Sequence, residues 1–168
     1  MGRAKIELYV EMLEKAKAET LAAAGKVGQS QALYQGREAT ATPLWLLGHM
    51  ANALNGVTLI WVFCGEGVLT REQRKPFAPD FAGGAPPTSD ATAYPPWQDV
   101  IQCYNAVMTK VIEEVRAMED AWLPKPLKGE VPEPLRAFFP SNGATLNQMV
   151  SHDAYHRGQI ALLTRLAG

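Results

Sequence analysis

Hydrophobic residues recur at helical spacing through most of this chain. Between residues 6 and 24 an apolar residue returns about every 3.6 positions, with Glu and Lys between, which predicts an amphipathic helix ending near Gly25. A second stripe follows the YPPW motif (residues 94–97) and predicts another helix, which ends before Pro124. The stripes consist of Ile6, Tyr9, Val10, Leu13 and Leu21, and of Val100, Ile101, Tyr104, Val107, Met108, Val111, Ile112, Val115 and Met118.

Two further helices are predicted from their end signals. Thr42 and Pro43 are typical of an N-cap and a first turn, and the apolar run that they open continues to about Phe63 before Gly65 and Gly67. This run is apolar almost all round, which places the helix at the centre of the fold. The last helix starts near PSNGATLNQM (residues 140–149), with Ser141 or Thr145 as its cap, and continues to Leu166.

Four long helices whose apolar faces must be buried against one another predict an all-α fold, a four-helix bundle. The 168 residues suit a single domain, residues 1–168. A Pro- and Gly-rich connector, residues 65–96, joins the second and third helices and is much longer than an antiparallel hairpin needs. We therefore expect a crossover that makes these two helices parallel, with Phe77, Phe81 and Tyr94 packed over one end of the bundle.

Charge and composition exclude several classes of partner. The net charge is -1, with 16 basic and 17 acidic residues spread along the chain, so no nucleic-acid partner is expected. The N-terminal segment is interrupted by charges and the longest apolar run by polar residues and glycines, so we expect a cytoplasmic protein without a membrane span. Cys64 and Cys103 form no CxxC pair, which predicts reduced cysteines used as small apolar residues.

The chain has three histidines, and each falls on a predicted inward face. His152 and His156 are four residues apart, about 40° of helical rotation, and share a stripe with Met149 and Ile160. His49 lies on the most apolar helix, in line with small residues that leave space beside its ring. Three imidazoles together favour a divalent metal site, because an ion satisfies several neutral nitrogen donors at once.

Two other interpretations apply to these histidines. Each could be a core histidine that is hydrogen-bonded to a neighbouring polar group or carbonyl. HDAYH (residues 152–156) also resembles the HExxH motif of zinc peptidases, with Asp153 replacing the general base. The peptidase interpretation fails because Asp is one methylene shorter and only twelve residues follow His156, too few for a third downstream ligand.

PLWLLGHMANAL (residues 43–54) together with SHDAYHRGQIALLTRL (residues 151–166) resembles the DinB-like superfamily of metalloenzymes. The HxxxHRGQ pattern carries the resemblance, which covers nearly the whole chain. It implies a four-helix bundle with a long crossover and one divalent metal held by His49, His152 and His156. Zinc or nickel is the expected ion, with manganese or iron as further options. The resemblance also implies a homodimer.

Three neutral imidazoles leave the ion its full charge and an open coordination position, which is typical of a catalytic site. That position could take a water, acidified toward neutrality, or a thiolate. Members of the superfamily include transferases and isomerases that use low-molecular-weight thiols such as bacillithiol or mycothiol. The resemblance therefore implies a metal-dependent thiol transferase acting on a small electrophilic substrate. The alternative is a non-catalytic metal- or ligand-binding stress-response protein.

Residues around the ligands are also candidates. Gln159, near His152 on the helical wheel, and Asn52, one turn after His49, could orient a ligand. Arg157 points away from the histidines and is expected at the surface or an interface, with Asp153 or Glu38 as partner. No residue is assigned as catalytic acid or base. Aromatic residues could line a pocket for a small organic substrate: Trp45, Trp61, Trp97 and Phe139.

Overall fold

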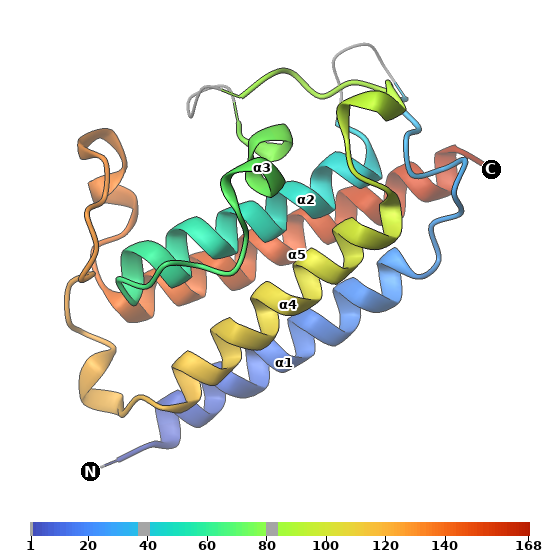
Figure 1. The fold of residues 1–168 in the computed structure, drawn as a ribbon. Helices are drawn as coiled ribbons and strands as arrows, with labels where there is room; N and C mark the ends of the chain where they lie inside the picture. Colours follow the sequence, from blue (N-terminus) through green and yellow to red (C-terminus); the bar gives the residue numbers. More distant parts are fainter. Residues whose placement is uncertain (1, 37–40, 80–83) are drawn as a thin grey trace.

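The structure, a computed structural model, describes residues 2–36, 41–79 and 84–168. Its four long segments are α1 (Ala4–Ala24), α2 (Pro43–Ala53) continued by the π-helix η1 (Leu54–Val62), α4 (Trp97–Arg116) and α5 (Asn142–Leu166). They lie side by side as a bundle (Figure 1). No strand occurs in the residues that the structure describes, which confirms the predicted all-α fold.

The connectivity is that of a bundle with a crossover. α1 and α2 each pack against both α4 and α5. α2 and α4 run in the same direction, and α1 and α5 run in the opposite one (Figure 1). The long connector therefore joins two parallel helices, as its length predicts. None of the helices in the described part of the chain has the length and apolar run needed to cross a bilayer.

The ends of the helices follow their capping residues. Thr42 Oγ1 accepts a hydrogen bond from the backbone N–H of Trp45 at 3.1 Å, and Pro43 occupies the first turn of α2. Of the two candidate caps of α5, Ser141 fills the role, with its Oγ accepting from the N–H of Ala144 at 3.3 Å. These polar contacts satisfy N–H groups that have no partner within the helix.

The central helix departs from the prediction after Ala53. A single α-helix to Phe63 is expected, but residues Leu54–Val62 form a π-helix, and the N–H of Phe63 bonds to the carbonyl of Thr58 five residues back. Cys64 then turns the chain with a positive φ of 59°. It is exposed, so the prediction of a cysteine used as a buried apolar residue is wrong here.

The crossover connector packs along α2. It contains α3 (Arg71–Arg74), η2 (Lys75–Phe77) and η4 (Ala91–Ala93). Asn55 Oδ1 accepts hydrogen bonds from the N–H groups of Val68 at 2.6 Å and Leu69 at 3.0 Å, which fixes the start of the connector. The buried Phe77 ring stacks on Tyr94 and lies over Gly48, where an added Cβ would come within 2.3 Å of it.

Phe77 therefore packs against the side of α2. The prediction that it packs over one end of the bundle is wrong. Gly48 is the reason, because a glycine has no Cβ and so lets an aromatic ring approach the helix closely. Phe81 lies outside the described residues.

The connector before α5 contains η5 (Asp120–Trp122) and η6 (Glu133–Phe138). The N–H of Gly129 in this connector donates a hydrogen bond to the carbonyl of Trp61 at 2.7 Å.

Candidate metal centre

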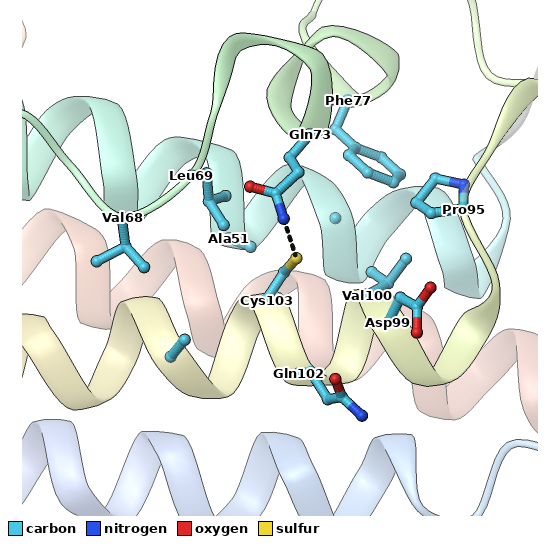
Figure 2. Close-up of a pocket in the computed structure, with 12 residues that line it drawn as sticks. Ala51, Val68, Leu69, Gln73, Phe77, Pro95, Asp99, Val100, Gln102 and Cys103 are labelled. Atoms are coloured by element: carbon cyan, nitrogen blue, oxygen red, sulfur yellow. Dashed lines mark hydrogen bonds between the residues drawn. The ribbon is translucent and has the colours of Figure 1, made fainter.

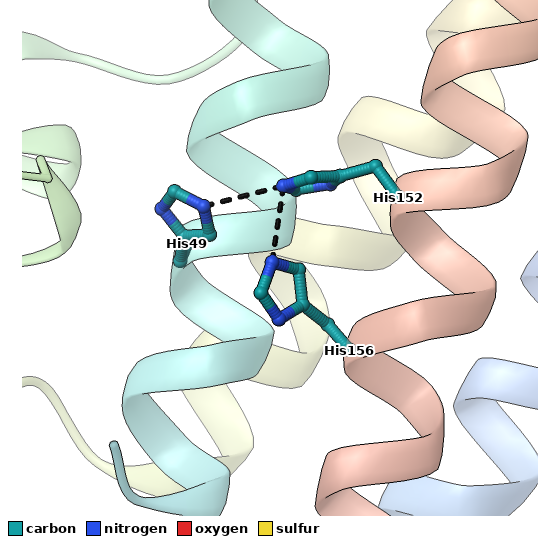
Figure 3. Close-up of side chains that lie close together, drawn as sticks. All are labelled: His49, His152 and His156. Atoms are coloured by element: carbon teal, nitrogen blue, oxygen red, sulfur yellow. Dashed lines mark hydrogen bonds between the residues drawn. The ribbon is translucent and has the colours of Figure 1, made fainter. Parts of the chain in front are cut away.

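The three histidines meet between α2 and α5. His49 extends from α2 toward α5, and His152 and His156 extend from successive turns of α5 toward α2 (Figure 3). The Nε2 atom of His152 lies 3.3 Å from Nε2 of His49 and 3.1 Å from Nε2 of His156. One nitrogen of each ring can be chosen so that all three lie within 4.8 Å of one another, although His49 and His152 are 103 residues apart in sequence.

His49 is held by the connector and by its own helix. Its Nδ1 lies 3.3 Å from the carbonyl oxygen of Phe77, and its ring is stacked on Trp45 at a centroid distance of 4.8 Å. Asn52 Nδ2 donates to the same carbonyl at 3.4 Å. Asn52 thus lies beside His49, as predicted, but it reaches the carbonyl that contacts His49 and not the imidazole itself.

His156 is held from within α5. Its Nδ1 lies 2.6 Å from Oε1 of Gln159, one turn further along the helix. Gln159 therefore lies next to the histidines, as predicted. It contacts His156, however, and not His152. The exposed Tyr155 ring lies against His156 at a centroid distance of 5.1 Å.

Burial keeps all three imidazoles neutral at physiological pH. Loss of hydration, and then the neighbouring charge of His156, lowers the pKa of His49 to about 4. Loss of hydration, followed by the charges of His156 and His49, lowers the pKa of His152 to about 3. Burial also lowers the pKa of His156, and the contact with Gln159, which raises this pKa, offsets part of the effect. A neutral imidazole has one bare nitrogen, which is the form that binds a metal.

The partners of the Nδ1 atoms determine where those bare nitrogens point. A carbonyl oxygen only accepts hydrogen bonds, so the proton of His49 belongs on Nδ1, facing Phe77. Gln159 Oε1 places the proton of His156 on Nδ1 in the same way. Both Nε2 atoms then direct lone pairs at Nε2 of His152, which has one proton at most to donate. The two short contacts of His152 cannot both be hydrogen bonds.

The arrangement fits a divalent cation better than it fits three histidines alone. A cation among the three Nε2 atoms would satisfy every lone pair and turn the repulsive contact into an attractive one. Nitrogen ligands at the usual zinc distances in a tetrahedron are about 3.3 Å apart. Two of the three nitrogen–nitrogen separations, 3.1 and 3.3 Å, are close to this value, and all three nitrogens lie within 4.8 Å of one another. The donor set, three imidazoles and no thiolate, suits zinc, nickel or another first-row ion.

A buried polar cluster lies on another face of α5, and we call it the Asp153 network. Asp153 is 1% exposed, and its two carboxylate oxygens accept from Thr20 Oγ1 at 2.7 Å and Tyr104 Oη at 2.6 Å. Arg157 donates to Asp153 at 3.3 Å and pairs with Glu19 at 2.8 Å. Burial raises the pKa of Asp153, and the three donors offset part of this rise because each of them lowers the pKa. The network joins α5 to α1 and α4.

The Asp153 network settles two sequence-based questions. Asp153 is bound to α1 and α4, so it does not take the place of a peptidase general base beside the histidines. Arg157 is 23% exposed and pairs with Asp153 and Glu19, so the predicted partner Asp153 is right, and the side chain lies between α5 and α1 rather than free at the surface. Glu38 lies outside the described residues. Asp153 lies on the same helical stripe as Met149 and Ile160, and this inward position of a charged residue is the sequence feature that indicates a buried polar contact.

A separate hollow of about 460 Å³ opens between α2 and α4 beneath the connector (Figure 2). Phe77 and Gly48 form part of its wall, and Gln73 donates to the sulfur of Cys103 at 3.7 Å. Burial raises the pKa of the Cys103 thiol, which keeps it protonated. No histidine lines this hollow.

The four aromatic residues considered as pocket walls do not gather around the histidines. Trp45 alone is stacked on one of them. Trp61 packs on Phe139 at a centroid distance of 5.8 Å, and Trp97 is buried in the core. The bundle interior therefore accounts for most of these rings, and Trp45 is the one whose contact bears on the candidate metal centre.

Comparison with known sequences places the fold and the candidate centre in one family. No curated protein matches the chain. The family model of the DinB superfamily matches residues 12–160, a span that contains all three histidines and all four long helices in whole or in large part. The chain therefore belongs to the DinB superfamily.

Proposed function

We propose that His49, His152 and His156 bind one divalent metal ion. The convergence of their three Nε2 atoms carries this proposal, since two of those atoms present bare lone pairs to the third. Membership of the DinB superfamily supports it. Zinc or nickel is the expected occupant, with manganese or iron as further options.

We further propose that the centre serves a metal-dependent thiol transferase acting on a small electrophile. Three protein ligands leave an open position on an ion of this kind, and the ion would supply Lewis acidity and a place to hold a thiolate nucleophile. In the reaction a sulfur–carbon bond forms as the bond from that carbon to the leaving group breaks, and the thiol proton departs with the leaving group. A low-molecular-weight thiol would be the co-substrate.

The residues around the imidazoles have distinct roles in this proposal. The carbonyl of Phe77 and the side chain of Gln159 hold the protons of His49 and His156 on Nδ1, so that each Nε2 stays free. Trp45 covers one face of His49. The three rings are half-buried and not sealed in the core, which leaves a small molecule a path to them from solvent.

The test is thiol-dependent consumption of a generic electrophile, monochlorobimane, with and without added zinc or nickel. Untagged protein would be assayed against a panel of cellular thiols, with His152→Asn as the matched variant. We expect turnover that needs both thiol and metal and that is lost in the variant. Equal rates with and without metal would refute the transferase proposal.

One observation favours a second candidate, a non-catalytic metal- or ligand-binding protein of a stress response. Within the described residues, no carboxylate or amine is hydrogen-bonded to any of the three imidazoles, so no evident acid or base stands next to the candidate centre. Stoichiometric metal binding with no turnover across the whole thiol panel would support this candidate.

A further inference from the structure

The half of α5 that carries the two histidines is held by few apolar contacts. After Met149, the fully buried residues of this helix are Asp153 and Ile160, and two apolar residues, Val150 and Leu163, are partly buried against the core. Tyr155, Leu162 and Leu166 point to solvent. A helix with so narrow a buried face can rotate about its axis at little cost in apolar burial, because apolar contacts are not directional. Something more directional must fix its rotation.

Asp153 provides that directionality. Its Oδ1 accepts from Thr20 on α1 and its Oδ2 from Tyr104 on α4, and both donors are fully buried. Two hydrogen bonds from two helices to two oxygens of one planar carboxylate leave it a single orientation. A rotation of α5 would break one or both of these hydrogen bonds. The carboxylate of Asp153 would then be buried without its partners, which costs free energy because a buried charged group needs hydrogen-bond partners.

The histidines are sensitive to the same rotation. An atom about 5 to 6 Å from a helix axis moves by about 1 Å when the helix turns by about 10°. Metal–nitrogen distances tolerate about 0.2 Å. A rotation of α5 by even a few degrees would therefore move His152 and His156 out of the positions in which they can bind an ion together with His49 on α2.

We propose that Asp153, Thr20 and Tyr104 are positioning residues for the candidate metal centre: they fix the rotation of α5 and so hold His152 and His156 where they can share an ion with His49. This inference rests on the proposed metal binding. Arg157 adds to the network by linking Asp153 to Glu19 on α1.

Thr20 offers a matched pair of variants. Thr20→Val keeps the shape of the side chain and removes the hydroxyl that reaches Asp153, whereas Thr20→Ser keeps the hydroxyl and removes a methyl group. Zinc affinity would be measured by competition with a chromophoric chelator at 25 °C, on protein shown to be folded by circular dichroism. We expect affinity about 10-fold weaker for Thr20→Val, in the range usual for groups that orient metal ligands. Thr20→Ser should stay within about twofold of the parent.

Tyr104→Phe provides an independent variant from α4, in case Thr20→Val does not fold. Ile6→Ala, a buried change near Asp120 at the other end of α1, controls for loss of stability alone. The absorption spectrum of bound cobalt should change in Thr20→Val and Tyr104→Phe and not in Ile6→Ala. Unchanged zinc affinity and cobalt spectrum in both hydroxyl-deletion variants would overturn the positioning role and leave the metal proposal standing. Absence of zinc binding by the parent protein would overturn both.

Discussion

At the scale of single residues, His156, like His49, has a neighbour at each of its two ring nitrogens. Its Nδ1 faces Gln159 and its Nε2 faces His152. With the ring removed, two imidazoles remain, which is one ligand fewer than catalytic zinc sites use.

We therefore predict about one divalent ion per chain in untagged protein and close to none in His156→Ala. Elemental analysis after dialysis measures this directly. Tyr155→Ala, which removes the exposed ring beside His156 and no nitrogen ligand, is the control and should keep its ion. An ion content that is unchanged in His156→Ala would show that the metal binds elsewhere.

The lowered pKa values predict how the metal-free protein responds to acid. His49 titrates at about 4 when folded and at about 6.5 when unfolded, so the unfolded chain takes up the proton first as pH falls. Its contribution to the free energy of unfolding is constant above pH 6.5 and decreases from there toward pH 4. The loss between pH 7.5 and 5.5 is about 1.4 kcal/mol for one such imidazole.

Urea unfolding at pH 7.5 and 5.5, with chelator present, tests this for the parent and for His49→Asn. The variant should lose about 1.4 kcal/mol less than the parent between the two pH values, because asparagine does not titrate. Equal losses would mean that His49 has an ordinary pKa in the folded chain.

At the scale of the helices, the segment formed by α2 and η1 contains two glycine positions with opposite surroundings. A Cβ at Gly48 would lie 2.3 Å from the ring of Phe77, whereas a Cβ at Gly56 would meet nothing within 4 Å. Gly48→Ala should lower the free energy of unfolding by about 1 to 3 kcal/mol, because the ring must move. Gly56→Ala should be neutral or stabilising by up to about 1 kcal/mol, since alanine restricts the unfolded chain.

Urea denaturation of the two variants side by side makes this comparison, and each serves as the control of the other. Gly48→Ala should also weaken metal binding, since the carbonyl of Phe77 contacts His49. Equal stabilities of the two variants would mean that the connector does not pack on α2 at Gly48.

The long helices could be predicted from the sequence because their apolar periodicity and their caps are local properties. The π-helix could not, because most of Leu54–Val62 is buried, and a run without a polar face does not distinguish 3.6 residues per turn from a wider turn. The histidines could be predicted as a group from their shared inward faces. For the Asp153 network, the helical register of Asp153 predicts only that its side chain faces inward. The partners could not be predicted, since Thr20 and Tyr104 lie 133 and 49 residues away from Asp153 and only packing brings them together.

For the whole molecule, we predict a homodimer. The resemblance to the DinB superfamily is the main ground for this prediction, since helix α2 is largely covered within the chain. Exposed apolar side chains lie on α1, on α5 and in the two connectors: Leu8, Val68, Phe138, Tyr155, Leu162 and Leu166. Light scattering at micromolar concentration should give twice the chain mass of 18.3 kDa. A mass near 18 kDa would contradict the prediction.

Metal removal should lower stability without unfolding the bundle. The core formed by the four helices does not depend on the three imidazoles, so the fold should persist without an ion. At free metal about a thousandfold above its dissociation constant, binding adds roughly 4 kcal/mol, which corresponds to about 8 to 16 °C in melting temperature for a chain of this size.

Thermal melts with and without chelator measure the shift, and circular dichroism at 25 °C checks that the helices remain. Loss of helical signal on adding chelator at that temperature would mean that the ion is structural.

The wide separation of the histidines along the chain also orders events during synthesis. His49 leaves the ribosome about 100 residues before His152, an interval of about 5 to 20 seconds at usual elongation rates. Throughout that interval a nascent chain offers an ion one imidazole, which binds weakly. If the three histidines bind an ion as proposed, its set of ligands is complete only after α5 has been made, so we do not expect the ion to nucleate the bundle. Cells short of metal should still accumulate the folded protein, ready to be loaded after translation has ended.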